Sequence, residues 1–273
     1  VFANASVTTT VQSGGNPNLA PEQADTLTAG FVYQPSFAAW IDGLSLAVDW
    51  YDIDLFGAVG SLGAQRIVDE CYNNHNYCSL ITRNPDTGQV QRIIDSNQNV
   101  AAARTRGVDI ELQYRMEPDF FRDAQESLNL RGFAGYLMES STTPLAGTRQ
   151  DEAGTLNRPE WTATLVANYA VGPYGVRLQQ RYYDSTRINV NWVEGVDVDD
   201  NSIASQSITN LALSYTGETE SGGVWQASFN VNNLFDREPP VVPSIGQRGP
   251  SQTVSNNFDV FGRRYQLSFD MSF

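Results

Sequence analysis

Apolar and polar residues alternate strictly along parts of this chain, and this alternation limits what the chain can fold into. The C-terminal segment 261–273, FGRRYQLSFDMSF, places Tyr265, Leu267 and Phe269 on one parity and Gln266 on the other. A repeat of two is that of a β-strand, because successive side chains point to opposite faces of a sheet. The chain therefore ends in a strand with one apolar and one polar face, where a domain would ordinarily end in a frayed polar tail.

The same alternation recurs in about nine segments, most of them of roughly nine residues or more, long enough for a tilted strand to cross a bilayer. The segments are 24–34, 44–50, 107–115, 127–138, 161–169, 174–183, 209–215, 225–233 and 261–273. Each sets a polar face against an apolar one, as strands do when two different environments flank a sheet. The pattern predicts an all-β fold and favours an antiparallel transmembrane β-barrel.

The connectors between these segments alternate in length, which is typical of outer-membrane barrels with tight periplasmic turns and long extracellular loops. The long connectors are 56–103, 140–158, 184–206 and 236–258. Aromatic residues gather near the strand ends, where amphipathic rings meet lipid headgroups in such barrels. These residues are Trp40, Trp50, Trp161, Tyr169, Tyr182, Tyr183, Trp225 and Phe235. For any one of them, a place in a protein core is an equal alternative.

The composition excludes some classes of protein and leaves others open. The 273 residues carry 31 Asp and Glu against 17 Lys and Arg, a formal net charge of −14, so no basic face is available for nucleic acid. No apolar run approaches the ~18 residues of a transmembrane helix. The mean hydropathy of −0.34 does not separate a soluble protein from a membrane barrel, because barrel strands alternate. The first residues lack the charged start and apolar core of a signal peptide, so we expect that preceding sequence is missing.

The long connector 56–103 contains both cysteines of the sequence, Cys71 and Cys78. Its segment GAQRIVDECYNN has the composition of a short helix. Two cysteines close together in a polar loop of an exported chain predict a disulfide formed in the periplasm. The alternative is a metal site made by Cys71, His75 and Cys78, which lacks a clear fourth ligand.

Signs of catalytic chemistry are absent from the sequence. It contains no nucleophile elbow, no HExxH pair and no phosphate-binding glycine loop, so we expect no enzyme activity, no catalytic residues and no cofactor. Asp197, Asp199 and Asp200 are candidate calcium ligands, but their loop lacks the spacing and the closing Glu of a known calcium loop. A solvated acidic loop fits these residues better, and no metal site is predicted.

Five segments, in the family's order, resemble the C-terminal half of TonB-dependent outer-membrane receptors. They are GNPNLAPEQADTLTAGFVYQP (15–35), LSLAVDWYDIDL (44–55), ARTRGVDIELQYR (103–115), NVNNLFDREPP (230–240) and FDVFGRRYQLSFDMSF (258–273). The resemblance implies a barrel of about 22 strands with a plug domain in its lumen. It also implies import of a scarce nutrient, either an iron chelate, cobalamin or a glycan, with energy from the TonB complex of the inner membrane.

The chain departs from the family pattern because about nine strands do not complete such a barrel, and the plug domain and energy-coupling box are absent. We therefore interpret residues 1–273 as the C-terminal barrel portion of a longer receptor in the outer membrane of a Gram-negative bacterium. The expected partners are outer-membrane lipid, the barrel-assembly machinery and the TonB complex, reached through the missing N-terminal part. The ligand is an unidentified small molecule or glycan.

The resemblance also assigns roles to the faces of the strands. In the last strand it implies the signal for the barrel-assembly machinery, here Tyr265, Leu267, Phe269 and Phe273. Polar faces line the lumen of a barrel, where charges contact the plug or a passing solute instead of lipid. The lumen-facing candidates are Asp109, Glu111, Arg131, Arg177 and Arg181. For each of them, a purely structural pairing with another charge is the alternative.

Two other functions remain open at this point. A soluble β-sandwich that binds carbohydrate shares the alternating strands and the aromatic residues, but it predicts turns at a regular spacing of ~8–12 residues. A passive porin-type barrel shares the lipid-facing side but lacks the receptor-like segments. A detergent requirement distinguishes the sandwich from the membrane proteins, and a plug domain upstream distinguishes a receptor from a porin.

Overall fold

The computed structural model describes residues 9–38, 40–121, 124–144, 149–242 and 258–272. The chain divides into two compact units. Unit 1 comprises residues 1–27, 53–105 and 141–151, and unit 2 comprises residues 28–52, 106–140 and 152–273.

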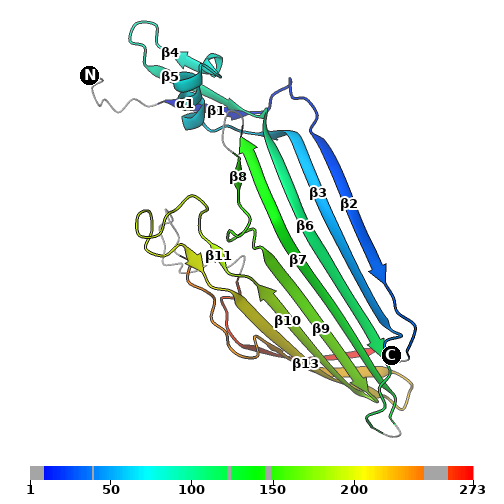
Figure 1. The fold of residues 1–273 in the computed structure, drawn as a ribbon. Coiled ribbons are helices and arrows are strands. Elements are labelled where there is room, and N and C mark those ends of the chain that lie inside the picture. Colours follow the sequence, from blue (N-terminus) through cyan, green and yellow to red (C-terminus); the bar gives the residue numbers. More distant parts are fainter. Residues whose placement is uncertain (1–8, 39, 122–123, 145–148, 243–257, 273) are drawn as a thin grey trace. The chain divides into compact units, whose positions relative to one another are not determined.

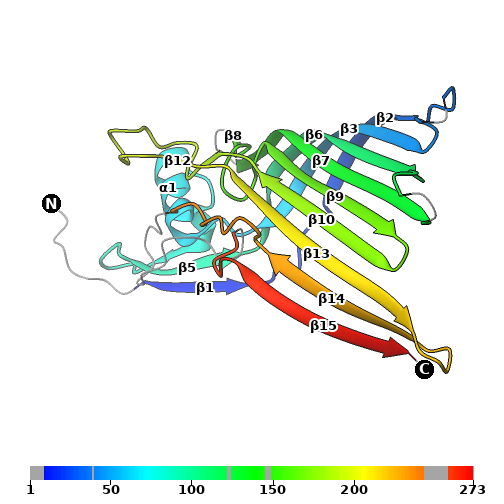
Figure 2. The same cartoon turned by 90° about the horizontal axis from the view of Figure 1, so that it is seen from below.

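Most of the described strands belong to one sheet, in the order β15-β14-β13-β10-β9-β7-β6-β3-β2, with β8 (Gln150–Asp151) pairing with β7 beside this path. The strands of the path are β2 (Gln23–Tyr33), β3 (Leu44–Gly60), β6 (Gln98–Met116), β7 (Glu126–Pro144), β9 (Trp161–Val171), β10 (Tyr174–Tyr183), β13 (Gln206–Glu218), β14 (Val224–Asn232) and β15 (Arg264–Ser272). Neighbours from β7 to β15 are antiparallel (Figures 1 and 2). Each predicted segment overlaps one of these strands, which confirms the all-β, largely antiparallel fold.

In unit 2 the register of neighbouring strands gives the sheet two unlike faces. One row of directly paired residues is Leu128, Tyr169, Val176, Leu213, Phe229 and Leu267. The next row is Asn129, Asn168, Arg177, Ala212, Asn230 and Gln266. Because side chains alternate along each strand, these rows lie on opposite faces, one apolar and one polar. On β15, seen beside β14 in Figure 2, Leu267 is 82% exposed, so no described residue covers the apolar face there.

The predicted connector bounds are wrong at two places, because the strands extend further than their alternation shows. β3 continues to Gly60 and β6 begins at Gln98, inside the predicted connector 56–103, and β7 continues inside the predicted 140–158. Trp50 consequently lies within β3 and not near its end. Gly57 has a φ of 63°, a left-handed conformation of the kind found at β-bulges. Such a residue interrupts the two-residue alternation, so the alternation does not reveal the part of the strand beyond it.

Unit 1 contains a small folded module, built from the connector between β3 and β6 together with a strand that precedes β2. Its elements are β1 (Thr10–Gly14), α1 (Ala64–Asn74), the 3-10 helix η1 (Cys78–Leu80), β4 (Ile81–Arg83) and β5 (Val90–Ser96). The three strands form a sheet in the order β1-β5-β4, with β1 parallel to β5. Ile67 of α1 and Ile93 of β5 are 1% and 5% exposed and supply the buried apolar residues of the module. The sequence predicted α1 correctly, whereas this sheet was not anticipated.

A disulfide joins Cys71 at the end of α1 to Cys78 in η1, which confirms the predicted bond. It also removes both thiolates from the alternative metal site with His75. The amide of Gly63 donates to Asp95 Oδ1 at 3.1 Å, and this hydrogen bond links the start of α1 to the end of β5.

One cluster of buried apolar residues in unit 2 lies where its connectors meet the sheet. Ile203, Val242 and Phe258 are each less than 5% exposed, and Leu156, Tyr183 and Ile188 pack against them. Two short strands, β11 (Thr186–Arg187) and β12 (Ser202–Ile203), pair within the connector between β10 and β13. No helix of the described chain is long and apolar enough to cross a membrane.

Candidate functional site

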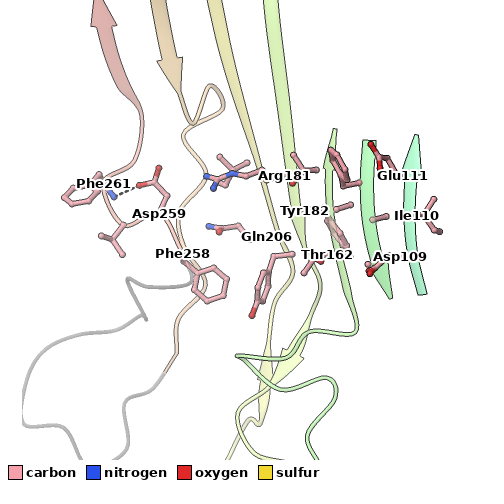
Figure 3. A pocket seen from close by; sticks show the side chains of 18 of the residues that line it. Asp109, Ile110, Glu111, Thr162, Arg181, Tyr182, Gln206, Phe258, Asp259 and Phe261 are labelled. Carbon is pink, nitrogen blue, oxygen red and sulfur yellow. Dashed lines mark hydrogen bonds between the residues drawn. The ribbon is translucent and has the colours of Figure 1, made fainter. Parts of the chain in front are cut away.

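A pocket of about 790 Å³ opens on the polar face of unit 2, at the ends of β9, β10 and β13 that adjoin the long connectors. Strands β3, β6, β7, β9, β10 and β13 supply side chains to one wall, and the segment 258–264 supplies the other (Figure 3). The pocket is therefore built from residues far apart in the sequence that the register of the sheet brings together.

Three of the predicted lumen-facing residues, Asp109, Glu111 and Arg181, line this pocket. The position of Asp109 on the polar face follows from its neighbours. Its Oδ1 lies 3.4 Å from where a Cβ on Gly135 would stand, and Gly135 pairs directly with Thr162 of β9. Glu111 shares this face because it is two residues further along β6.

The other two candidates share the same face but lie outside the pocket. Arg131 pairs with Val166, and Arg177 pairs with Asn168, in rows nearer the short turns. The guanidinium of Arg177 donates to Asn168 Oδ1 at 3.3 Å. That this shared face lines a lumen stays a prediction.

The segment 258–264 is held in shape by Asp259. Arg264 donates from Nη2 to Asp259 Oδ2 at 2.8 Å, and the amide of Phe261 donates to Asp259 Oδ1 at 3.0 Å. The Arg264 guanidinium also lies 5.1 Å from the centre of the Phe261 ring, a cation–π distance. The side chain of Asp259 is thus already paired with groups of the same segment. In the same segment, a hydrogen bond with Tyr265 and the charge of Asp236 raise the pKa of Arg263.

Phe258 anchors this segment against the sheet. It is 3% exposed, and its ring meets that of Tyr183 edge to face with 5.4 Å between centroids. The Tyr183 hydroxyl donates in turn to the carbonyl of Leu156. Next to them Gln206 is 8% exposed and donates from Nε2 to the Glu238 carbonyl at 3.4 Å. Within the described part of the chain, its Oε1 accepts no hydrogen bond and is available to a ligand.

The described residues that line the pocket give it a negative charge. Its carboxylates are Asp49, Asp109, Glu111 and Asp259, and its guanidinium groups are Arg181 and Arg264. Because Asp259 and Arg264 neutralise one another, three carboxylates remain against a single cation. Of these groups, Asp49, Glu111 and Arg181 make no hydrogen bond or ion pair with any other described residue, so they are open to interact with a solute.

The aromatic residues form a continuous row on the apolar face, at the short-turn ends of four strands. Tyr174, Tyr215, Trp225 and Phe269 are in successive ring contact, with centroid distances of 5.1, 5.3 and 5.7 Å. The sequence pattern picked out Trp225 as a strand-end aromatic and missed Tyr174 and Tyr215. A row of such rings is the arrangement expected at a membrane interface.

The predicted assembly-signal residues of β15 share that apolar face. Tyr265 stacks on Phe229 at 6.1 Å, Leu267 pairs with Phe229, and Phe269 stacks on Trp225. Phe273 lies outside the described residues. Recognition by the assembly machinery stays a prediction.

The acidic connector 194–201 uses its carboxylates to shape turns. Asp197 Oδ2 accepts from the Val193 amide at 2.8 Å, and Asp200 Oδ1 accepts from the Ser202 amide at 2.7 Å. Hydrogen bonds from Ser202 lower the pKa of Asp200. In the part of the chain that the structure describes, no group of three or more His, Cys, Asp or Glu residues is placed to hold a metal ion.

The sequence patterns do not single out Gln206, Phe258 and Asp259, which line the pocket together with the predicted residues. Asp259 and Phe258 precede the last strand in a segment without alternation. A usable signal was present in FDVFGRR, where an acidic residue and a glycine flank an aromatic, as at a tight turn. Gly262, with a φ of 69°, occupies that turn.

Comparison with known protein families gives one match. A family model described as TonB dependent receptor-like, beta-barrel, matches residues 2–234. No curated protein sequence matches the chain.

Several solved structures share the fold. The siderophore receptor PirA from Acinetobacter baumannii is 17% identical with a TM-score of 0.53, over 94% of this chain and 32% of that one. A mutant of the ferric enterobactin receptor PfeA from Pseudomonas aeruginosa is 15% identical with a TM-score of 0.57, over 94% and 32%. The outer membrane transporter YddB from Escherichia coli is 9% identical with a TM-score of 0.55, over 97% and 34%. The chain thus spans about a third of the length of these structures.

Proposed function

This chain belongs to the TonB-dependent receptor-like β-barrel family, and we propose that it forms the C-terminal part of the barrel of an outer-membrane receptor that imports an iron chelate. The observation that carries this proposal is the family match over residues 2–234, on a sheet whose apolar face is uncovered. Transport then uses energy from the TonB complex, and a plug domain upstream of these residues makes the contact with it. The protein acts as a transporter and not as an enzyme.

The two faces of the unit 2 sheet support a place in the outer membrane. Leu165, Leu213 and Leu267 on the apolar face are 47%, 41% and 82% exposed. Water would disfavour so large an exposed apolar surface, whereas lipid solvates it. The aromatic row at the short-turn ends fits the level of the headgroups.

The polar face supports a role in passing a solute. Charged and amide side chains line it, and a pocket opens at its long-connector end, where a ligand arriving from outside the cell would first reach the barrel wall. The choice of an iron chelate rests on the similar structures, two of which are named as receptors for siderophores or ferric enterobactin.

The two alternative functions fit these observations less well. A soluble β-sandwich would bury the apolar face against a second sheet, but Leu267 and Phe269 are 82% and 63% exposed. A passive porin shares the lipid-facing side but not the family match. Cobalamin and glycans remain chemically possible ligands of the same barrel, and the similar structures give no support to them.

The proposal is tested on the whole receptor in its own iron-starved bacterium. Membranes are separated on a density gradient and the receptor is located with an antibody against unit 1. Uptake of radioactive iron, supplied as a panel of chelates, is then compared between cells with and without the receptor gene. We expect the protein in the outer-membrane fraction and loss of uptake of at least one chelate in the deletion strain.

A strain that lacks TonB supplies the control for energy coupling, since uptake through this receptor should stop while binding to the cell surface remains. Unchanged uptake of every chelate in the deletion strain would refute the iron-chelate assignment. Unchanged uptake without TonB would refute the energy source and favour a passive pore.

A further inference from the structure

We infer that the pocket on the polar face of unit 2 selects neutral or cationic ligands over anionic ones. This deepens the proposed function, on which it rests, by naming the class of iron chelate. A chelate that carries amine or other hydrogen-bond donor groups fits this pocket, whereas a multiply anionic ferric catecholate does not.

The charges of the pocket give the first argument. Asp49 of β3 and Asp109 and Glu111 of β6 face it without a neutralising partner of opposite charge among the described residues, and Arg181 is the only unpaired cation there. A pocket with low-dielectric walls and one excess sign concentrates solutes of the opposite sign and repels those of its own. Rejection of a like charge also contributes to specificity, because an anionic ligand that loses its water in this pocket finds too few partners of opposite charge.

The pairing of Arg264 strengthens this argument. A guanidinium that lines a pocket would ordinarily attract an anion, but this one donates to Asp259 at 2.8 Å and lies over the Phe261 ring. An anionic ligand would have to displace a carboxylate that is already in place. Arg264 therefore adds little attraction for anions.

Gln206 supplies an observation independent of the acidic residues. Its side chain is 8% exposed, its amide nitrogen is engaged with the Glu238 carbonyl, and its Oε1 is unused by the described residues. Figure 3 shows it between Arg181 and Phe258, on the pocket wall. This oxygen is free to accept a hydrogen bond from an N–H or O–H group of a ligand. A ligand ammonium group offers such donors, whereas a carboxylate offers none.

Aromatic side chains complete the chemistry. Phe133, Phe258 and Phe261 line the pocket beside the carboxylates. Aromatic faces attract cations and also cover apolar linkers. Carboxylates with aromatic rings thus suit a ligand with positive charge on an apolar frame.

The test uses the whole receptor purified in detergent and two xanthene dyes of similar size, the cationic tetramethylrhodamine methyl ester and the anionic fluorescein. Fluorescence anisotropy gives the affinity for each dye at low and high salt. We expect the cation to bind at least about tenfold more tightly at low salt, a preference that salt should reduce. In the double variant Asp109→Asn with Glu111→Gln, the preference should fall at least about threefold.

Asp270→Asn is the matched control, because it removes one carboxylate from the same polar face of β15, outside the pocket. It should leave the dye preference unchanged. Heat-modifiable migration on gels shows that each variant is folded, and Asp49→Asn provides a second neutralised pocket if the double variant is not. An anionic preference, or a preference that no pocket variant alters, would overturn the inference.

Iron uptake distinguishes this inference from the proposed function. Cells that carry the receptor are offered ferrioxamine B, a cationic hydroxamate chelate, and ferric enterobactin, an anionic catecholate. Uptake of the hydroxamate alone supports both proposals, and uptake of the catecholate alone overturns the charge preference. If uptake of no chelate in the panel depends on the receptor but the dyes still discriminate, the iron-chelate function fails and the selectivity of the pocket stands.

Discussion

Gly43, between β2 and β3, shows how closely two chain segments approach in unit 2. The amide of Arg115 donates to the Gly43 carbonyl at 3.0 Å. A Cβ added to Gly43 would overlap the carbonyl oxygen of Arg115, which is backbone and has no freedom to rotate away. We expect Gly43→Ala to lower the free energy of unfolding of the receptor by about 1–3 kcal/mol, as overpacking does. The loss is measured as a lower midpoint of heat-modifiable migration. Gly60→Ala is the control, since a Cβ there meets nothing within 4 Å, and equal effects of the two changes would contradict this account.

For single residues, the sequence predicted which face each charged side chain occupies but not which partners it meets. Alternation alone placed Asp109 and Arg181 on the polar face of their strands. Asp109 lies near Gly135 and Thr162. These two residues belong to other strands, whose register is decided by tertiary pairing across the sheet. No local pattern contains that information. The pocket therefore could not be predicted from the sequence, although half of its charged residues were.

At the scale of the strand, β15 permits a direct comparison of its two faces. Leu267 lies near its middle on the apolar face, is 82% exposed and pairs with Phe229. Gln266 is its neighbour on the polar face and pairs with Asn230. Under the proposed function, Leu267→Arg places a charge in lipid and should cost about 2–4 kcal/mol, whereas Gln266→Arg should be mild. Denaturant unfolding of the receptor in lipid vesicles measures both. Equal losses would show that the apolar face does not meet lipid.

The disulfide-linked module of unit 1 is an element with its own stability. The bond between Cys71 and Cys78 encloses a short loop, so it should contribute at the low end of about 2–4 kcal/mol. We expect the paired change of both cysteines to serine to speed proteolysis within residues 64–96 while the barrel strands stay protected. Alkylation of the exported wild-type receptor without reductant should label neither thiol. Labelling of both would show that the bond does not form in the cell.

At the scale of elements, the sequence predicted the strands whose two faces meet different environments, but not the short strands of unit 1. The strands from β9 to β14 lie between two environments, and alternation located each of them to within a few residues. In the sheet of β1, β4 and β5, the strands β4 and β5 lie in a polar connector, and β5 pairs with β1 across more than 60 residues of sequence, as Arg92 does with Thr10. Its strands are too short for a repeat to show. The helix α1 was still predicted, from the composition of its segment.

At the scale of the whole molecule, a closed barrel should require strands in addition to those of this chain. The described strands run from β15 at one edge of the sheet to β2 at the other, and no pairing among described residues joins those two strands. Open edges present unpaired backbone groups, which are not tolerated in lipid and promote aggregation in water. Since the chain spans about a third of the similar receptors, we expect residues 1–273 alone neither to close as a barrel nor to transport.

The measurement is expression of this chain behind a signal sequence, followed by heat-modifiable migration and uptake of radioactive iron. Co-expression with the remaining part of the receptor is the control, because supplying the missing strands should restore a folded product. A heat-modifiable, iron-importing product from this chain alone would mean that its strands close a barrel by themselves.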